Sequence, residues 1–141
     1  MIRLSQHSLT RLSQNVVVRI LNHLSGHIGI TNHRLKVAEE AIASGLYETL
    51  QFPFCYLATE EDKRLVALCK EADMGFIAMK ALSGGLIMNS AAAYAFEAEY
   101  DNVLPIWGVQ RERELDEFLS YIVCPPKMDD ELRAVIEKDH K

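Results

Sequence analysis

Short apolar runs alternate with amphipathic segments along the chain from residue 27 onward. The first run, 27–31 (HIGIT), contains β-branched residues and predicts a strand. The segment 34–44 has the spacing of one apolar helical face, formed by Leu35, Ala38 and Ile42. We expect Asn32 to cap this helix and Gly45 to end it.

Three further strand–helix units are predicted, with strands that start about every 21 to 28 residues, at 48–52, 75–79 and 103–107. The helix after the first of these strands opens with 59–62 (TEED). This is a capping-box sequence that also places three acids at the positive end of the helix dipole. The buried stripe of that helix is expected at Leu65, Leu68, Cys69 and Ala72.

The last two units also combine an apolar strand with a helix. The strand 75–79 (GFIAM) is followed by a Ser-Gly-Gly loop at 83–85 and by a predicted helix over about 90–100. The strand 103–107 precedes a helix with apolar residues at helical spacing, namely Leu115, Phe118, Leu119 and Ile122. A proline pair breaks this helix, and a final helix is expected over 130–138.

Continuous apolar strands that alternate with helices are typical of parallel sheets covered by helices, so the predicted fold class is α/β. Crossovers between parallel strands are right-handed, which leaves an open doubly wound sheet or a (β/α)8 barrel. The spacing of apolar residues does not choose between them. A single domain over 27–139 accounts for all four units.

Four strings stand at the predicted strand ends: 28–33 (IGITNH), Gln51, 75–85 (GFIAMKALSGG) and 105–108 (PIWG), the last followed by 114–119 (ELDEFL). In order and spacing they resemble the second half of an aldo-keto reductase barrel. The resemblance implies a partial TIM (β/α)8 barrel of about four parallel β/α units. Among aldo-keto reductases, the chain is similar to the subgroup that often carries a C-terminal iron–sulfur segment.

The resemblance also implies a site for a nicotinamide cofactor, NAD or NADP, at the carboxyl ends of the strands. Thr31, Asn32 and Gln51 would hydrogen-bond the carboxamide, which needs both a donor and an acceptor. The backbone of 81–85 would approach the pyrophosphate, and Glu117 matches an acid near the adenine. The full set of implied cofactor residues is Thr31, Asn32, Gln51, Met79, Lys80, Ala81, Leu82, Gly84, Gly85 and Glu117.

Two parts of the implied site depart from the family's usual residues. Met79 stands where many members stack an aromatic ring on the nicotinamide, and its thioether packs less rigidly. Residues 108–110 (GVQ) replace the Lys, Ser and Arg that often bind the 2′-phosphate, and Glu114 stands where an Arg is usual. Arg111 or Arg113 is the available substitute, so the choice between NAD and NADP stays open.

The catalytic half of the family's barrel has no counterpart in this chain. Members carry an Asp, Tyr, Lys and His tetrad on the first four strands, and carbonyl reduction needs such a proton donor beside the hydride acceptor. We assign no catalytic residue and expect the chain alone to be inactive. Four barrel strands would leave two open edges and an uncovered inner face, so we expect self-association, for example as a two-fold dimer, or pairing with a complementing half-barrel.

Other interpretations of the same residues remain open. Without the resemblance, Asn32 would be interpreted as a helix cap and Gln51 as a hydrogen-bonded polar residue inside the barrel. The segment 83–85 would be interpreted as a generic turn. Lys80 lies just past a strand, where a desolvated lysine can form a Schiff base with a carbonyl substrate, as in a lyase. A non-catalytic module that binds a partner through its open edges is the remaining alternative.

Composition narrows the function classes. The chain of 141 residues is 49% hydrophobic and has a net charge of -5, which argues against a general nucleic-acid binder. No apolar run approaches the ~20 residues needed to cross a bilayer, so no membrane contact is expected. Cys55, Cys69 and Cys124 lie far apart without metal-ligand spacing. We expect a cytoplasmic protein with reduced thiols and no metal site.

Residues 1–26 form a basic segment, because no acid precedes Glu39 while several cations do, namely Arg3, Arg11, Arg19, Arg34 and Lys36. We expect a basic leader or a helix ahead of the first strand. An organelle transit peptide and a basic arm that touches nucleic acid are the alternatives.

Overall fold

The computed structural model describes residues 26–141 of the chain, and the predicted leader therefore lies, apart from Gly26, outside the described residues. The strands are β1 (Gly29–Thr31), β2 (Thr49–Pro53), β3 (Gly75–Met79) and β4 (Val103–Pro105). The α-helices are α2 (Leu35–Ser44), α3 (Glu60–Glu71), α4 (Ser90–Glu97), α5 (Glu112–Val123) and α6 (Asp130–Asp139), and a short 3-10 helix spans Ser83–Gly85.

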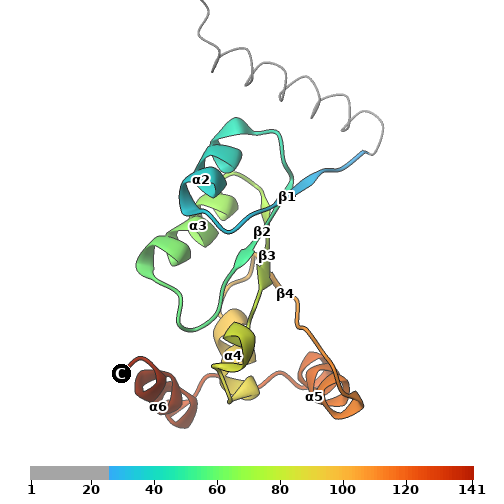
Figure 1. Ribbon diagram of the computed structural model, residues 1–141, viewed down its shortest axis with the longest axis vertical. Coiled ribbons are helices and arrows are strands. Elements are labelled where there is room, and N and C mark those ends of the chain that lie inside the picture. The colour runs from blue at the N-terminus through green and yellow to red at the C-terminus, as the bar shows by residue number, and fades with distance from the viewer. Residues whose placement is uncertain (1–25) are drawn as a thin grey trace, which may run out of the picture.

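The four strands form one parallel sheet in the order β1-β2-β3-β4, which confirms the α/β prediction. Each strand pairs with the next one along the chain, so the described sheet has no reversal of strand order. A doubly wound sheet contains such a reversal, because its helices cover both faces. Here α2 and α3 lie on the same side of the sheet, and α4 and α5 follow beyond its β4 end (Figure 1).

The two faces of the sheet differ in burial. The face that packs against the helices is fully buried at the residues Leu50, Phe52, Phe76 and Ala78. The opposite face carries Thr49, Gln51 and Ile77, which are half-buried, and Leu104, which is 61% exposed. No helix within 26–141 covers this second face, in agreement with the expectation of an uncovered inner face.

An aromatic cluster joins the sheet to α4. The ring of Phe54, just after β2, lies 5.5 Å from Phe76, 5.4 Å from Phe96 and 5.2 Å from Tyr100 between centroids. All but the first of these contacts cross from the β2 exit to α4 and the turn behind it. Edge-to-face pairs at these distances add to the free energy gained by burial.

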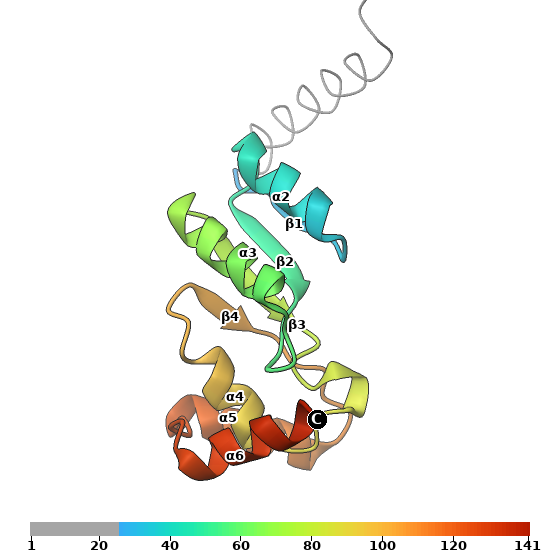
Figure 2. The same cartoon turned by 90° about the vertical axis from the view of Figure 1, so that its left-hand side faces the viewer.

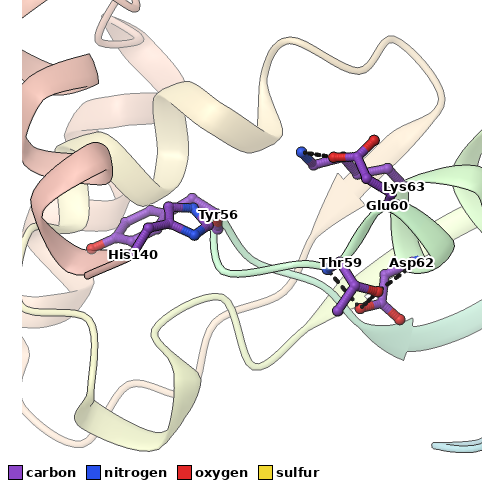
Figure 3. Close-up of polar contacts among 6 residues, drawn as sticks. All are labelled: Tyr56, Thr59, Glu60, Asp62, Lys63 and His140. Atoms are coloured by element: carbon purple, nitrogen blue, oxygen red, sulfur yellow. Dashed lines mark hydrogen bonds and ion pairs between the residues drawn. The ribbon is translucent and has the colours of Figure 1, made fainter.

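The predicted helix signals act as expected at two helix ends. Thr59 and Asp62 form a reciprocal capping box at the start of α3, with the Asp62 N–H donating to Thr59 Oγ1 at 3.2 Å (Figure 3). Gly45 ends α2 in the left-handed region with a φ of 62°, and its N–H donates to the carbonyl of Ile42. Both signals are local, so tertiary packing does not override them.

Several predicted details are wrong, and one of them is the strand expected over 103–107, which ends at Pro105. The N-cap of α2 is Arg34, because Asn32 Oδ1 accepts the Arg34 N–H at 2.9 Å and closes a turn before the helix begins. Ala72 is exposed, since α3 ends there and Asp73, with a φ of 54°, turns the chain into β3. The helix expected over 90–100 ends at Glu97, and Tyr100 instead packs its ring into the aromatic cluster.

Helix α5 keeps its predicted apolar spacing but leaves much of that stripe open to solvent. Leu115, Leu119 and Ile122 are 43%, 47% and 56% exposed. Figure 2 shows α5 beside α4, away from α2 and α3. Its contact with α4 and the β4 exit is aromatic, with the Phe118 ring 5.1 Å from Trp107.

The C-terminal helix is fixed to the exit of β2. The hydroxyl of Tyr56 donates to Asp139 Oδ2. His140 Nε2 lies 2.8 Å from the Tyr56 carbonyl oxygen, and Figure 3 shows these two residues together. Burial and the Asp139 carboxylate raise the pKa of the Tyr56 phenol. This phenol therefore stays protonated as a structural donor.

The amino end of the uncovered face is built from small residues. Gly29 and Gly75 flank Thr49 as its register partners in β1 and β3. A Cβ atom at Gly29 would lie 2.2 Å from Thr49 Oγ1. A methyl group at this position would therefore overlap the Thr49 hydroxyl, and the Thr49 side chain would have to shift to accommodate it.

We expect Gly29→Ala to reduce the free energy of unfolding by about 1–3 kcal/mol, because the added methyl overpacks against Thr49. Denaturant unfolding followed by circular dichroism measures this loss. Thr49→Ala is the matched partner: the double variant should lose less than the sum of the two single variants. Additive losses would show that the contact does not limit this position.

None of the helices within residues 26–141 is long and apolar enough to cross a membrane.

Candidate functional site

The carboxyl ends of β1, β2 and β3 bring three of the predicted cofactor residues together on the uncovered face. Thr31 is the register partner of Gln51. Gln51 Nε2 donates to the Met79 sulfur at 3.6 Å, although no sequence signal links these two side chains. Thr31 is exposed, Gln51 is half-buried and Met79 is only 9% exposed. Burial therefore increases across the three strands from β1 to β3.

Asn32 joins this group through its backbone. Its N–H donates to the Gln51 carbonyl at 3.2 Å, which extends the β1–β2 ladder by one residue. Its Oδ1 is occupied by the Arg34 N–H, while its Nδ2 is enclosed and has no acceptor among the described residues. An enclosed donor without a partner is unfavourable, and a ligand oxygen would reach this Nδ2 only if the Asn32 side chain turned outward.

The loop after β3 takes an unusual backbone path. Lys80, Ser83, Gly84 and Gly85 have positive φ angles of 61°, 47°, 67° and 96°. Space around both glycines is open. The N–H groups of Ser83 and Gly85 donate to the carbonyls of Lys80 and Leu82. At most the N–H groups of Ala81, Leu82 and Gly84 are therefore available to an anion.

The side chains of this loop divide between the core and solvent. Ala81 is 2% exposed and Leu82 packs partly against the core, so these two anchor the loop. Lys80 is exposed. A Schiff-base lysine is activated by desolvation, and this amine lacks that burial.

Glu117 is placed on α5, outside the group at the strand exits. Its Oε1 accepts hydrogen bonds from Ser90 Oγ at 2.5 Å and from the Tyr121 hydroxyl at 2.9 Å. The contact with Ser90 fixes α5 to the start of α4, while the contact with Tyr121 lies within α5. The predicted role of Glu117 at an adenine would require this carboxylate to leave both donors.

The basic substitutes expected for a 2′-phosphate are only partly available. Arg111 forms an ion pair with Glu114 at 3.7 Å. The Gln110 N–H, followed by the Arg111 N–H, donates to Glu114 and lowers the pKa of its carboxyl. An ionised Glu114 at this position repels a phosphate.

The described residues thus differ along the site that the resemblance implies. Gln51 and Asn32 place amide groups, and Met79 an apolar side chain, at the strand exits. The loop after β3 has few free N–H groups, and the carboxylates of Glu114 and Glu117 already accept hydrogen bonds.

Sequence reasoning missed a buried carboxyl. Glu97 at the end of α4 is 1% exposed, and its Oε2 accepts from Trp107 Nε1 at 3.2 Å while its Oε1 has no partner among the described residues. Burial raises the pKa of this carboxyl to about 8, against the opposing effect of the Trp107 hydrogen bond. A glutamate at a helix end resembles an ordinary solvated charge, so no local signal marks it.

The buried thiols and the tyrosine phenols of the described residues are poor candidates for reactive groups. Burial raises the pKa of the Cys69 thiol to about 11 and also raises that of Cys55, so neither is an activated nucleophile. Desolvation raises the pKa of Tyr100 and of Tyr121. Within residues 26–141 no cluster of three His, Cys, Asp or Glu side chains could hold a metal ion.

The chain matches no family model, and no curated protein matches it.

Proposed function

We propose that the chain is the nicotinamide-binding half of an aldo-keto reductase-type barrel, an oxidoreductase element without catalytic residues of its own. The observation that carries this proposal is the grouping of Thr31, Gln51 and Met79 at the carboxyl ends of three neighbouring strands. Ligand sites in parallel α/β barrels form at this end of the sheet. The unpartnered Nδ2 of Asn32 adds a donor for a carbonyl oxygen once this side chain turns outward from its enclosed position.

The same geometry explains why no turnover is expected. A hydride acceptor needs a proton donor within hydrogen-bond reach. The phenol of Tyr56 is held by Asp139, and that of Tyr121 is held by Glu117 and Ser90. Neither stands at the group formed by Gln51 and Met79.

The proposal predicts weak binding in which the nicotinamide mononucleotide half of the cofactor supplies most of the affinity. The adenosine half should contribute little, because few N–H groups are free for the pyrophosphate and both Glu114 and Glu117 are already paired. We expect NADH, NADPH and reduced nicotinamide mononucleotide to bind with similar dissociation constants, in the millimolar range. Titration of the full chain, followed by nicotinamide fluorescence, measures all three. Gln51→Ala and Asn32→Ala should each weaken binding about fivefold, as expected for one lost hydrogen bond, and together abolish it.

Glu117→Ala is the matched control, since its carboxylate is hydrogen-bonded to Ser90 and Tyr121, away from the strand exits, and its loss should leave nicotinamide binding unchanged. No fluorescence change up to millimolar ligand would contradict the proposal. A clear preference for NADPH would contradict the mononucleotide-like fit.

A second candidate function is a non-catalytic half-barrel that binds a partner through its open face. The exposure of Leu104 and the α5 stripe favours it. A lyase with a Schiff base at Lys80 has no comparable support, because the amine is exposed. Borohydride trapping with a keto acid, read by mass spectrometry at Lys80, should give no adduct.

A further inference from the structure

Helix α5 is attached to the rest of the protein largely through aromatic side chains. None of its residues is fully buried. The rings of Phe118 and Tyr121 contact Trp107, the residue that follows β4, with centroid distances of 5.1 and 6.2 Å. A hydrogen bond from Ser90 to Glu117 adds a polar contact with the start of α4. An element with so little buried surface opens at a lower free energy than the core strands.

The segments on both sides of α5 are irregular. Residues 106–111 connect β4 to α5, and residues 124–129 connect α5 to α6 (Figure 1). Most of these residues are exposed, and Gly108 has open space around it. The end of α6 is held independently, by the contacts of Asp139 and His140 with Tyr56. Helix α5 can therefore move without breaking a strand or another helix.

The carboxyl of Glu97 lies beneath this aromatic contact. It is 1% exposed, its Oε2 accepts the Nε1–H of Trp107, and its Oε1 has no partner among the described residues. An ionised carboxylate in such a position requires water or another donor at the free oxygen. Trp107 is itself only half-buried, so its displacement together with α5 gives water a direct route to Glu97.

The surroundings of Glu97 do not compensate a negative charge. Burial raises the pKa of its carboxyl, and among the described residues the Trp107 hydrogen bond, but no cation, counteracts this effect. Burial also raises the pKa of the Cys55 thiol, and the Glu97 carboxylate adds to that increase. The titratable side chains on the elements packed around Glu97 are Cys55 after β2, Tyr94 on α4, Glu99 and Tyr100 after α4, Glu117 and Tyr121 on α5, and Arg133 on α6. The guanidinium of Arg133 pairs with Glu99 at the surface.

We propose that loss of the Glu97 proton is coupled to an opening of α5 and the segment around Trp107, while the sheet with α2 and α3 stays folded. The closed form keeps Glu97 neutral, and the open form lets water reach the carboxylate. Opening therefore releases one proton, so a rise in pH shifts the equilibrium toward the open form. The device is independent of the proposed cofactor binding, because it does not involve Gln51, Asn32 or Met79.

Amide hydrogen exchange of the full chain, followed by mass spectrometry and corrected for the intrinsic exchange rate, tests this proposal. The protection of α5 should be lower than that of β2 and β3. It should fall about tenfold per pH unit between about pH 5 and pH 8, as release of one proton requires. In Glu97→Gln, whose carboxamide does not ionise, the protection of α5 should not depend on pH. Glu99→Gln should behave as the wild type, because this carboxylate pairs with Arg133 at the surface.

A further variant tests whether the opening passes through the aromatic contact. Phe118→Ala removes the ring packed on Trp107, so it should lower the protection of α5 at every pH and keep the same dependence on pH. Unchanged protection in Phe118→Ala would overturn the proposal. So would a wild-type α5 whose protection is independent of pH, or one whose protection equals that of the sheet at every pH, since Glu97 would then ionise only on global unfolding.

Discussion

Glu97→Gln is expected to stabilise the protein by about 3–5 kcal/mol at pH 9 while leaving its stability at pH 4.5 nearly unchanged or slightly lower. The carboxamide keeps the shape of the side chain and an oxygen that can accept from Trp107 Nε1. It removes the ionisation that the buried site opposes.

The sign follows from the proton affinities of the two states. Burial raises the pKa of Glu97 from 4.5 to about 8 in the folded protein. Between these values the unfolded carboxyl is ionised while the folded one keeps its proton, so the folded state binds more protons. The free energy of unfolding therefore falls as pH rises from about 4.5 to 8, by about 5 kcal/mol in all, and levels off above that window.

Urea unfolding at a series of pH values measures this effect, with fluorescence of Trp107, the one tryptophan of the chain, as the probe. Glu99→Gln is the matched control: it lies two residues away and pairs with Arg133 at the surface. Its pH profile should follow that of the wild type. A wild-type profile that is flat between pH 5 and 8 would show that Glu97 is solvated.

Phe54→Ala is expected to lower the free energy of unfolding by about 3–5 kcal/mol, the range found when a large buried aromatic side chain is truncated. Phe54 is 2% exposed and its ring contacts Phe76, Phe96 and Tyr100. The substitution would leave a cavity between the β2 exit and α4. The rings of Phe76, Phe96 and Tyr100 are held by their own packing and would not move to fill it. A loss of this size approaches the whole stability of a small domain.

The midpoint and slope of guanidinium unfolding measure this loss. Leu86→Ala is the control, since Leu86 is 76% exposed and truncation should change stability by less than about 0.5 kcal/mol. Phe54→Leu should fall between the two, because it keeps much of the apolar volume. Equal stability of Phe54→Ala and Leu86→Ala would mean that α4 is not held by this cluster.

The existence and type of the strands and helices, and two of the helix ends, were predictable because their signals are local. The capping box at Thr59 and the left-handed Gly45 depend on residues within one helical turn. The sequence left two architectures open, an open doubly wound sheet and a barrel. Apolar spacing indicates which face of a strand is buried but not which strand lies next to it, so the strand order could not be predicted. Asn32 was wrongly predicted to be the N-cap of α2. Its side chain instead accepts the N–H of Arg34, the true N-cap, and closes a turn just before the helix.

The candidate site was predictable only as far as the resemblance placed residues on strand ends. It placed Thr31 and Gln51 at neighbouring strand ends, and in the structure these two residues are register partners. The hydrogen bond between Gln51 and Met79 spans 28 residues and depends on the packed register of β2 and β3. The burial of Glu97 was not predicted because it depends on tertiary packing. Its partner Trp107 lies outside the helix that contains Glu97, so the helix sequence alone does not indicate the contact.

The sequential strand order has a consequence for how the chain folds as it is synthesised. Each strand pairs with the one made just before it, so every β/α unit can dock as soon as it leaves the ribosome, without waiting for a distant segment. The contact between Tyr56 and His140 is an exception, since it joins residues 84 positions apart. Among the described helices α6 is synthesised last, and until it docks the exit of β2 lacks its contacts with Asp139 and His140.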